Sequence, residues 1–449
     1  MDTFGNSQPK IIPLELTENQ FQIYNKISRN YSHSFLFESL TGPEELAETS
    51  VMGFNPKIIL RGYSDRVEIE ENGKIDIVKT RDPFNELKKI LPKSNDQSYR
   101  YLGGAVGIVN YDAIRLVEDI PDSHDSPQPL IEFGIYDDGI LYDNLHKKLF
   151  YFYYDENRFD KLKMSDEKFH EFHASQIKPN MDKLEFSDIV NKAKKYIHNG
   201  DIFQVVLSRK FSFDAQGDAL TLYKTLRNLN PSPYMYHLKQ GTKTIIGASP
   251  EMLVRITNDK VETFPIAGTR KITDDEKENK RLADELLHDE KELAEHTMLV
   301  DLGRNDIGRV CRFGTVHPES LMQIKRFSHV QHIVTHVVGN LSSKNDMFDA
   351  FKAVFPAGTV SGAPKVRAMQ IIDELETEAR GPYAGAVGYF SFNGCCDFAI
   401  AIRSIFIEGN KGFVQSGAGI VSDSIDENEF KETEHKAGAM LQALREASE

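Results

Sequence analysis

Residues 186–213 have the sequence FSDIVNKAKKYIHNGDIFQVVLSRKFSF, in which one type of secondary structure gives way to another. Apolar side chains at helical spacing predict a helix that begins with Ser187 as its N-cap and ends at Gly200. The continuous apolar run that follows predicts a strand. Strand and helix patterns alternate irregularly after it, without the steady rhythm of βαβ units. We therefore expect an α+β fold rather than a doubly wound parallel sheet.

The first part of the chain consists mostly of short alternating segments. In DRVEIEENGKIDIVK, Asn72 and Gly73 stand between two such segments and predict a two-residue hairpin turn. After an aromatic strand that ends near residue 154, the chain becomes polar and charged. We therefore predict an N-terminal domain over residues 1–155, a linker over 156–182 and a C-terminal domain over 183–445.

Two similar segments, GAVGIVNYD from Gly104 and GAVGYFSFN from Gly385, lie far apart in the chain. Two copies at unrelated spacing do not make a repeat protein. We interpret both as strands whose glycines let neighbouring backbones pack closely.

The composition excludes several classes of function. The formal net charge is −14, from 68 acidic and 54 basic residues, so the surface as a whole repels nucleic acid and anionic lipid. The sequence has neither the pattern of a secretory signal nor an apolar run of about 18 residues, and we expect a cytoplasmic protein without membrane contact. The three cysteines, two of them the neighbours Cys395 and Cys396, lack the spacing of a disulfide framework or a zinc site.

An acidic pair within HDEKELAEH, residues 288–296, is the first candidate for chemistry. A helical pattern from about 274 to 304 places Glu292 and Glu295 on one face, with His288 one turn earlier on the same side. Taken alone, this spacing favours a solvated, charge-mixed helix face over a metal site.

A second acidic pair strengthens the metal interpretation. Glu429 and Glu432 are again three residues apart, and Lys436 follows four residues later on the same predicted helix. Two carboxylate pairs on two helices are able to enclose a hard cation. Mg²⁺, which commonly shares its oxygen ligands with an anionic substrate, suits them better than Zn²⁺ or Ca²⁺ does. From the pattern alone, a magnesium site and two solvated helix faces are about equally supported.

Other segments have features that suit an anion. In QSGAGIVSD, Gly417 and Gly419 leave backbone amides open to a carboxylate, as in a nest, and PAGTVSGAPKVRAMQII runs from a loop into the start of a helix. Arg403 lies in the apolar strand pattern FAIAIRSIFI, where burial of a guanidinium requires an acid or a carboxylate ligand. Each glycine segment, taken separately, is also explained as an ordinary turn.

Two further side chains draw attention. His332 belongs to a trio with His329 and His336 in SHVQHIVTHV, which strand or helix packing explains as well as a site does. Tyr383 precedes the glycine-rich strand that begins near Gly385 and is able to join the same site.

A series of motifs occurs in fixed order between residues 185 and 440: GDIFQVVLSRKF, SPEMLV, PIAGTR, ELAEHTMLVDLGRND, FPAGTVSGAPKVRAMQII, GPYAGAVGYF, IAIRSI, SGAGIVSDS and EFKETEHKA. This series resembles that of the chorismate-utilising enzymes, in particular the ammonia-dependent members that form anthranilate. The resemblance is highly specific over the second half of the chain and weaker over the first. It implies a two-sheet β-sandwich with helices packed on the outside.

The resemblance also implies roles for individual residues, by their positions in these motifs. Magnesium would be bound by Glu292, Glu295, Glu429 and Glu432. The substrate would contact Gly268, Thr269, Thr359, Tyr383, Arg403, Gly417, Gly419 and Lys436. The catalytic positions are the general acid Glu251, His332 and Gln204.

The reaction that the resemblance implies adds ammonia at C2 of chorismate, removes the C4 hydroxyl and eliminates pyruvate to give anthranilate, the first step of tryptophan biosynthesis from chorismate. Family members that add water have lysine at the position of Gln204, because water needs a base whereas ammonia already has a nucleophilic lone pair. Sister enzymes that form aminodeoxychorismate, the alternative activity, have lysine at the position of Ala267. An inactive homologue that senses tryptophan or acts as a scaffold is the non-enzyme alternative.

The chain lacks a glutaminase-like cysteine motif, while most ammonia at neutral pH is ammonium. We therefore expect a separate glutamine amidotransferase subunit that supplies ammonia, with two copies of each subunit in a heterotetramer.

In the first half of the chain, FLFESL resembles the family element that contributes to a tryptophan feedback site. Phe35 and Phe37 replace the usual leucines, and a strand in the core explains these phenylalanines as well as a site does. The residues implied at the feedback site are Glu38, Ser39, Pro233, Tyr234 and Met235.

Overall fold

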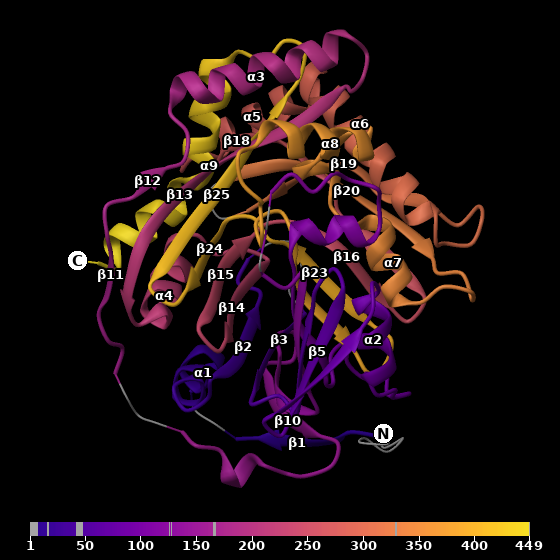
Figure 1. Ribbon diagram of the computed structural model, residues 1–449, viewed down its shortest axis with the longest axis vertical. Coiled ribbons are helices and arrows are strands. Elements are labelled where there is room, and N and C mark those ends of the chain that lie inside the picture. The colour runs from indigo at the N-terminus through magenta and orange to yellow at the C-terminus, as the bar shows by residue number, and fades with distance from the viewer. Residues whose placement is uncertain are drawn as a thin grey trace.

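The computed structural model contains two large antiparallel sheets with helices outside them (Figure 1). The structure describes residues 8–448 except 16–17, 42–47, 125, 127, 165–167 and 328–329. The predicted α+β class, with two sheets and outer helices, is confirmed.

The first sheet contains, in spatial order, β1 (Lys10–Leu14), β10 (Lys148–Tyr153), β9 (Asp138–Asp143), β3 (Thr49–Phe54), β2 (His33–Glu38), β14 (Tyr234–Gln240), β15 (Lys243–Ser249), β24 (Ser404–Glu408), β25 (Lys411–Ile420), β13 (Gln204–Gly217) and β11 (Phe172–Ala174), with β12 (Lys178–Pro179) and β21 (Gly362–Ala363) also paired to β13.

The second sheet contains, in spatial order, β18 (Ile266–Lys271), β20 (Val330–Asn340), β17 (Lys260–Thr263), β16 (Met252–Thr257), β23 (Cys396–Ile400), β22 (Ala386–Ser391), β7 (Gly104–Val109), β8 (Ile131–Tyr136), β4 (Ile58–Gly62), β5 (Arg66–Glu71) and β6 (Lys74–Lys79), with β19 (His317–Arg326) paired to β20. Strands from both sides of residues 156–182 therefore enter each sheet, and the division into two domains stays a prediction from the sequence.

The α-helices are α1 (Gln20–Ser28), α2 (Pro83–Ile90), α3 (Lys183–His198), α4 (Ala219–Leu229), α5 (Glu276–His288), α6 (Glu290–Gly308), α7 (Met347–Val354), α8 (Lys365–Leu375) and α9 (Asp426–Glu446). Short 3₁₀ helices are η2 (Tyr111–Leu116), η3 (Phe159–Lys161) and η4 (Gly358–Val360).

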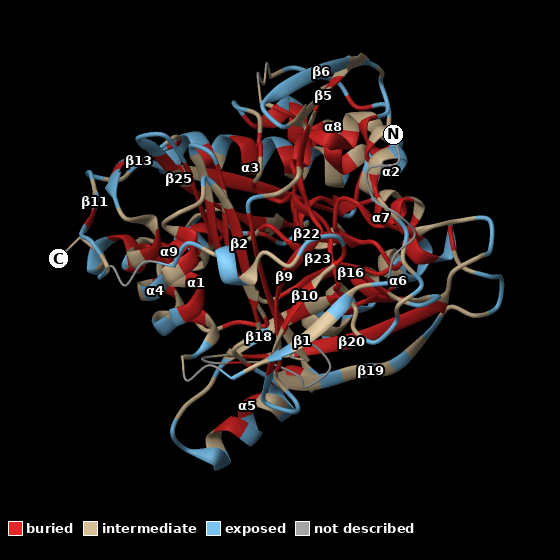
Figure 2. Ribbon diagram, turned by 90° about the horizontal axis from the view of Figure 1, so that it is seen from below, coloured by how far each residue is buried: buried red, intermediate tan, exposed pale blue. Residues whose placement is uncertain are grey.

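Buried apolar side chains fill the space between these layers. Buried residues are concentrated in the strands at the centre of the molecule (Figure 2). The largest cluster lies between the sheets and includes Phe35 of β2, Val106 of β7 and Val254 of β16. A second cluster packs α1, α4 and α9 against the outer face of the first sheet, and a third packs α3 and α8 against β13 and β25. Helices α5, α6 and α7 contact the second sheet. The outer layers thereby fix α6 and α9, the two helices that contain the acidic pairs.

Helix α3 begins earlier than the sequence pattern predicts. Asp182 is its N-cap and accepts hydrogen bonds from the backbone N–H groups of Leu184 and Glu185. Ser187 lies inside the helix, where its hydroxyl donates to Asp426 at the start of α9, so the prediction of Ser187 as the cap is wrong. The predicted end is confirmed, since Gly200 follows the helix with φ of +84°.

The predicted hairpin is confirmed. Asn72 and Gly73 join β5 to β6 and have φ values of 52° and 76°. A two-residue hairpin of type I′ requires this left-handed conformation at both central positions.

The two glycine-rich segments form neighbouring strands, β7 and β22, with Gly107 opposite Gly388. A Cβ atom on Gly107 would lie 1.9 Å from the carbonyl oxygen of Glu132 on the next strand. The interpretation of these glycines as sites of close backbone packing is confirmed.

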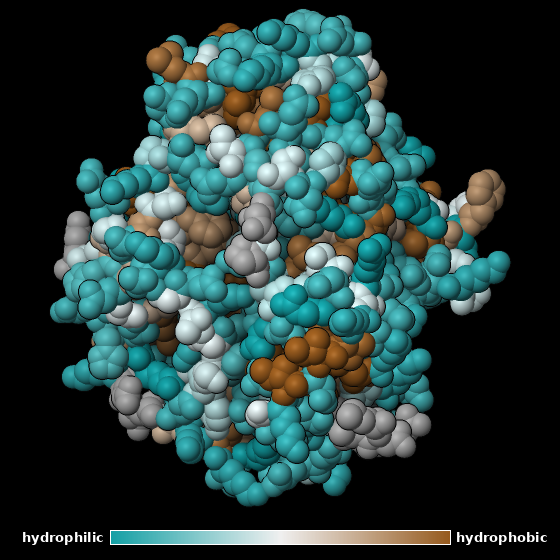
Figure 3. Space-filling model, in the orientation of Figure 1, coloured by the Kyte–Doolittle hydropathy of each residue, from teal (hydrophilic) through white to brown (hydrophobic). Residues whose placement is uncertain are grey.

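The molecular face shown in Figure 3 is predominantly hydrophilic, with hydrophobic side chains in small clusters. Large apolar side chains that are exposed include Ile75 and Ile77 on the hairpin and Phe313. Of the helices in the described ranges, none is long and apolar enough to cross a membrane.

A buried ion pair between Arg380 and Glu376 joins three elements beside the candidate active site. The Arg380 guanidinium donates to both carboxylate oxygens of Glu376 at 2.9 and 2.7 Å, and to the carbonyl oxygens of Val206 and Val360 at 2.7 Å each. Glu376 also accepts the backbone N–H of Ser208 at 2.8 Å. Because Arg380 is only 2% exposed, its charge depends on these partners rather than on water. The pair therefore holds β13, η4 and the end of α8 together.

Replacing Arg380 with Met should lower the free energy of unfolding by about 3–5 kcal/mol, because it leaves the buried Glu376 carboxylate without its cation. Arg281→Met is the matched control, since Arg281 forms its ion pairs with Glu278 and Glu285 on the exposed face of α5 and should cost under about 1 kcal/mol. Urea unfolding followed by circular dichroism measures both. Equal losses in the two variants would contradict the structural role of the buried pair.

Candidate active site

The site residues predicted from the sequence gather where the chain passes between the two sheets. Glu251 lies between β15 of the first sheet and β16 of the second, and Arg403 lies between β23 of the second sheet and β24 of the first. These two crossovers are bonded to each other. The Ile400 N–H donates to the Glu251 carbonyl at 3.1 Å, and the Ala248 N–H donates to the Arg403 carbonyl at 3.0 Å.

Glu251 is a buried carboxyl group. Its residue is 7% exposed, and burial raises its pKa to about 8. The Thr359 hydroxyl donates to its Oε1 at 3.0 Å and, together with the charge of Lys436, partly opposes that rise in pKa. Glu251 therefore holds a proton at neutral pH and has the chemical character of a general acid.

Two cations converge near Glu251. The Arg403 guanidinium donates to the backbone carbonyl of Lys436, and the Lys436 ammonium donates to the carbonyl of Gly417 at 3.1 Å. Among the residues that the structure describes, no acidic side chain forms an ion pair with Arg403, and desolvation lowers its pKa. The pair of cations is suited to an anionic ligand.

The sequence pattern around Arg403 predicts a strand, but Arg403 does not lie in one. It occupies the crossover with φ of +52°, because the chain turns there from β23 into β24. The prediction that Gly417 and Gly419 form a nest is also wrong, since both lie in β25 and pair there with Ser208 and Val206 of β13. Their missing side chains matter in another way. A Cβ on Gly417 would lie 2.9 Å from the Tyr383 hydroxyl, and one on Gly419 would lie 2.6 Å from Nε2 of Gln204.

Gly268 and Thr269 lie in a bulge of β18 opposite β20. Gly268 has φ of +64°, a conformation that favours glycine, and its carbonyl accepts a hydrogen bond from Nδ1 of His332 at 2.7 Å. This bond places the proton of the neutral imidazole on Nδ1 and leaves the lone pair on Nε2. Burial lowers the pKa of His332 to about 4, so the ring is neutral at pH 7.

The two described histidines of the trio, His332 and His336, have different roles. His336 stacks on Phe264 with ring centroids 4.0 Å apart and pairs with Glu262 at 2.9 Å, which is a structural role. His329 lies outside the described residues. Of the two that are described, only His332 joins the site.

The helix predicted over 274–304 is two helices, α5 and α6, separated at Asp289. Asp289 ends α5 and caps α6, accepting the backbone N–H groups of Lys291 and Glu292. His288 therefore lies at the end of a different helix from the acidic pair, where its ring contacts the carbonyl of Asp284, and it does not share the face of Glu292.

The acidic residues form two pairs. Glu292 on α6 has a raised pKa, first because of burial and then because of Glu295 nearby, and Glu429 on α9 has a raised pKa from burial and from Glu432. The charge of Lys291 on α6 acts on Glu429 of α9, so the starts of the two helices approach each other.

In the described parts of the chain, no group of three or more acidic, histidine or cysteine side chains is arranged to hold a metal ion. The donors are nevertheless hard carboxylate oxygens in mutually repelling pairs, which is the chemistry that suits Mg²⁺. A cation would relieve the repulsion that raises the pKa of Glu292 and of Glu429.

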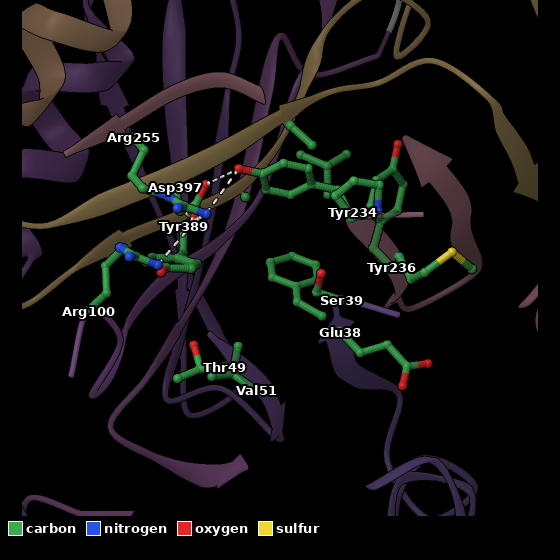
Figure 4. A pocket seen from close by; sticks show the side chains of 16 residues that line it. Glu38, Ser39, Thr49, Val51, Arg100, Tyr234, Tyr236, Arg255, Tyr389 and Asp397 are labelled. Atoms are coloured by element: carbon green, nitrogen blue, oxygen red, sulfur yellow. Dashed lines mark hydrogen bonds and ion pairs between the residues drawn. The ribbon is translucent and has the colours of Figure 1, made fainter. Parts of the chain in front are cut away.

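A separate cavity, partly open to solvent, lies between the sheets (Figure 4). Its lining includes all five residues that the resemblance implies for a feedback site: Glu38, Ser39, Pro233, Tyr234 and Met235. The hydroxyl oxygen of Ser39 is buried without a hydrogen-bond partner.

The Glu38 side chain points away from this cavity (Figure 4). Its carboxylate accepts the Tyr223 hydroxyl at 2.7 Å and the Arg227 guanidinium at 2.7 and 3.0 Å, and its side chain is fully buried. Glu38 therefore fixes the cavity wall and reaches the cavity only through its backbone.

The charged end of this cavity was not predicted from the sequence. Arg255 donates to Asp397 at 2.8 Å, the Tyr234 hydroxyl donates to the same carboxylate at 2.9 Å, and Arg100 lies 3.6 Å from it. The signal was present, because Arg255 stands in the apolar strand pattern MLVRIT and needs a partner just as Arg403 does. Only the pairing of β16 with β23 reveals that the partner is Asp397.

Together, these features suit one kind of chemistry. A neutral carboxylic acid lies beside two cations and two pairs of carboxylates, and a neutral histidine presents a lone pair. Such a site is able to bind an anionic molecule, hold a hard cation near it and protonate a leaving group.

Comparisons with known proteins agree with this chemistry. The profile of the chorismate binding enzyme family matches residues 32–442. Anthranilate synthase component 1 of Methanothermobacter thermautotrophicus is 44% identical, and the match covers 100% of this chain and 97% of that protein. Anthranilate synthase component 1 of Aquifex aeolicus is also 44% identical, over 96% of this chain and 93% of the relative.

Solved structures give the same result. The crystal structure of anthranilate synthase component I from Streptococcus pneumoniae matches with a TM-score of 0.78 and 39% identity, covering 88% of this chain and 92% of that one. The menaquinone-specific isochorismate synthase MenF from Escherichia coli matches with a TM-score of 0.75 over 98% of this chain and 95% of that one, at 20% identity, which shows a shared fold alone.

Replacing Glu251 with Gln should change how stability depends on pH. Below the ordinary carboxyl pKa of 4.5, the folded and unfolded chains both hold the proton. Between that pH and about 8, only the folded chain keeps it, so rising pH lowers the free energy of unfolding by about 1.4 kcal/mol per unit. The Gln variant lacks this loss and should be more stable than the wild type by about 5 kcal/mol above pH 8.

Urea unfolding of both proteins across this pH range measures the difference. Glu290→Gln, at an exposed position on α6, is the control and should follow the wild type. A constant offset between Glu251→Gln and the wild type would show that Glu251 is ionised in the folded protein.

Proposed function

The chain belongs to the family of chorismate binding enzymes and has the anthranilate synthase activity of its component 1 relatives, a lyase reaction, and from this we propose how its residues carry the reaction out. We propose that it converts chorismate and ammonia to anthranilate, pyruvate and water. A separate glutamine amidotransferase subunit would supply the ammonia, in the cytoplasm.

The protonated carboxyl group of Glu251 is the observation that carries this proposal. Loss of the C4 hydroxyl of chorismate requires a proton, because hydroxide is a poor leaving group. Glu251 keeps its proton at neutral pH, and Thr359 and Lys436 are positioned to act on its carboxyl group. A neutral acid beside cations thus matches a dianionic substrate that must lose hydroxide.

The cations and the small residues would orient the substrate. Arg403 and Lys436 are suited to its carboxylates, and Tyr383, which fits only because residue 417 is glycine, closes the same side. The lone pair of His332 at Nε2 is available to accept a proton during elimination of pyruvate.

Glu292, Glu295, Glu429 and Glu432 would hold magnesium, which, when bound, withdraws electron density from the substrate through a carboxylate. Their hard oxygen donors and mutual repulsion support this assignment.

Residue types support ammonia rather than water as the nucleophile. Gln204 carries an amide, which is not a base, whereas activation of water requires one. Ala267 on β18 carries no amine, so it cannot attack the ring as a lysine there could, which favours anthranilate over aminodeoxychorismate as the product. The component 1 names of the relatives imply a partner component. We propose that this partner is the amidotransferase subunit, with two copies of each chain in a heterotetramer.

The cavity between the sheets supports feedback inhibition by L-tryptophan. Several aromatic rings line it, and Arg100 and Asp397 place both signs of charge at one end, as a zwitterion requires. The unpartnered Ser39 hydroxyl is available to the ligand. This cavity shares strands with the active site but not its residues.

Glu295→Gln should abolish anthranilate formation, by at least about 10³-fold, while leaving the fold intact, because it removes a carboxylate charge from the site. The assay follows the fluorescence of anthranilate formed from chorismate, ammonium salt and Mg²⁺, and EDTA should stop the wild-type reaction. Exposed Glu290→Gln on the same helix is the control and should retain activity. Wild-type activity in Glu295→Gln, or in EDTA, would refute the magnesium assignment.

Ser39→Phe should fill the cavity and weaken tryptophan inhibition by roughly tenfold or more, since each tenfold step corresponds to about 1.4 kcal/mol of binding. The chain contains no tryptophan, so all indole fluorescence comes from the added ligand, and equilibrium dialysis separates its bound fraction from its free fraction. Ser343→Phe, in an exposed loop, is the control. Unchanged tryptophan binding in Ser39→Phe, or no binding by the wild type at millimolar concentration, would exclude this cavity as the feedback site.

A further inference from the structure

Gln204 connects a glycine of β25 with one glutamate of the acidic pairs. Its residue is 4% exposed at the start of β13, and its amide Nε2 donates to Oε1 of Glu295 at 3.1 Å. The same nitrogen lies 2.6 Å from the place that a Cβ on Gly419 would occupy. The amide therefore fills the space that the missing side chain of Gly419 leaves.

The direction of this hydrogen bond is fixed by chemistry. An ionised carboxylate only accepts hydrogen bonds, so the amide must turn its NH₂ group toward Glu295. Because the Gly419 backbone confines the amide on its other side, the amide has little freedom to turn away.

The other three glutamates have different partners. Glu292 pairs with Arg270 at 3.4 Å, Glu432 pairs with Lys436 at 2.6 Å, and the field of Lys291 acts on Glu429. Glu295 accepts its side-chain hydrogen bond from a neutral amide and Glu429 has one with the neutral hydroxyl of Ser424, whereas Glu292 and Glu432 face cations. A neutral donor orients a carboxylate without cancelling its charge.

We propose that Gln204 is a positioning residue for the metal ligand Glu295, and that residue 419 is glycine to leave room for the Gln204 amide. The inference rests on the proposed magnesium site. It assigns Gln204 a role in metal binding, beyond the absence of a base at this position, and gives Gly419 a function through Gln204 rather than through the substrate alone.

A lysine at position 204 would act differently. Its ammonium would bring a positive charge to Glu295 in place of the neutral amide. The amide of glutamine is thus matched both to the geometry of Glu295 and to its remaining charge.

Mn²⁺ binding to the full-length protein tests the proposal without any assay of activity. Free Mn²⁺ is counted by its electron paramagnetic resonance signal as metal is titrated into wild type, Gln204→Met, Gly419→Ala and the double variant. Each single change should weaken binding by about tenfold, as loss of a partner that orients a metal ligand does. The double variant should lose no more than either single one, because both act through the same amide.

Gln216→Met is the matched control, since it makes the same change as Gln204→Met at the exposed end of the same strand. Its Mn²⁺ affinity should equal that of the wild type. Thermal unfolding of each variant establishes that it is folded, and Gln204→Met decides the question if Gly419→Ala does not fold.

The outcomes distinguish the positioning role of Gln204 from the existence of the magnesium site. Mn²⁺ affinity in Gln204→Met equal to that of the wild type overturns the positioning role and leaves the magnesium site intact. Additive losses in the double variant overturn the link between Gly419 and Gln204. No Mn²⁺ binding by the wild type overturns the magnesium site and the positioning role together.

Discussion

The arrangement of the site depends on two backbone crossovers that are hydrogen-bonded to each other. At one of them the chain leaves the first sheet for the second and presents Glu251, and at the other it returns and presents Arg403. Two backbone hydrogen bonds of about 3 Å tie the crossovers together. A carboxylic acid and a guanidinium are thus placed by the frame of the sandwich itself rather than by flexible loops, and strand packing on both sides keeps their separation constant.

Charge at the site is arranged so that each group keeps the state its role requires. Burial keeps Glu251 protonated and His332 neutral, because both are surrounded by protein rather than water. The acidic pairs are half-buried and repel each other, which leaves them with an affinity for a cation. The charges of Arg380 and Glu376 are satisfied by each other, and Arg380 lies over the ring of Tyr383.

Much of the candidate site could be predicted from the sequence because it depends on local residue patterns. Spacing put Glu292 near Glu295, and an arginine in an apolar segment indicated a buried cation. The predictions failed where tertiary structure overrode a local pattern. Gly417 and Gly419 looked like a loop, but β13 pairs with their backbone and makes them part of a strand. The break at Asp289 was missed because its capping bonds interrupt an otherwise continuous helical period.

Contacts between residues that are distant in the chain could not be predicted from the sequence. Nothing in the strand pattern around Arg255 identifies Asp397, which is 142 residues away, as its partner. The hydrogen bond from Gln204 to Glu295, 91 residues apart, likewise follows from the tertiary structure and is indicated by no motif. Such contacts require the order of strands in each sheet, which a single sequence does not specify.

That order has a consequence for how the protein is made. On a ribosome, β2 and β7 emerge early, yet β2 pairs with β14 and β7 with β22, and those partners are translated much later. Until residue 391 has left the exit tunnel, the nascent chain exposes apolar strand edges that have no native neighbour. The early half of the polypeptide therefore cannot complete its fold as it is synthesised, and a chaperone that shields strand edges should matter more for this protein than for one built from consecutive domains.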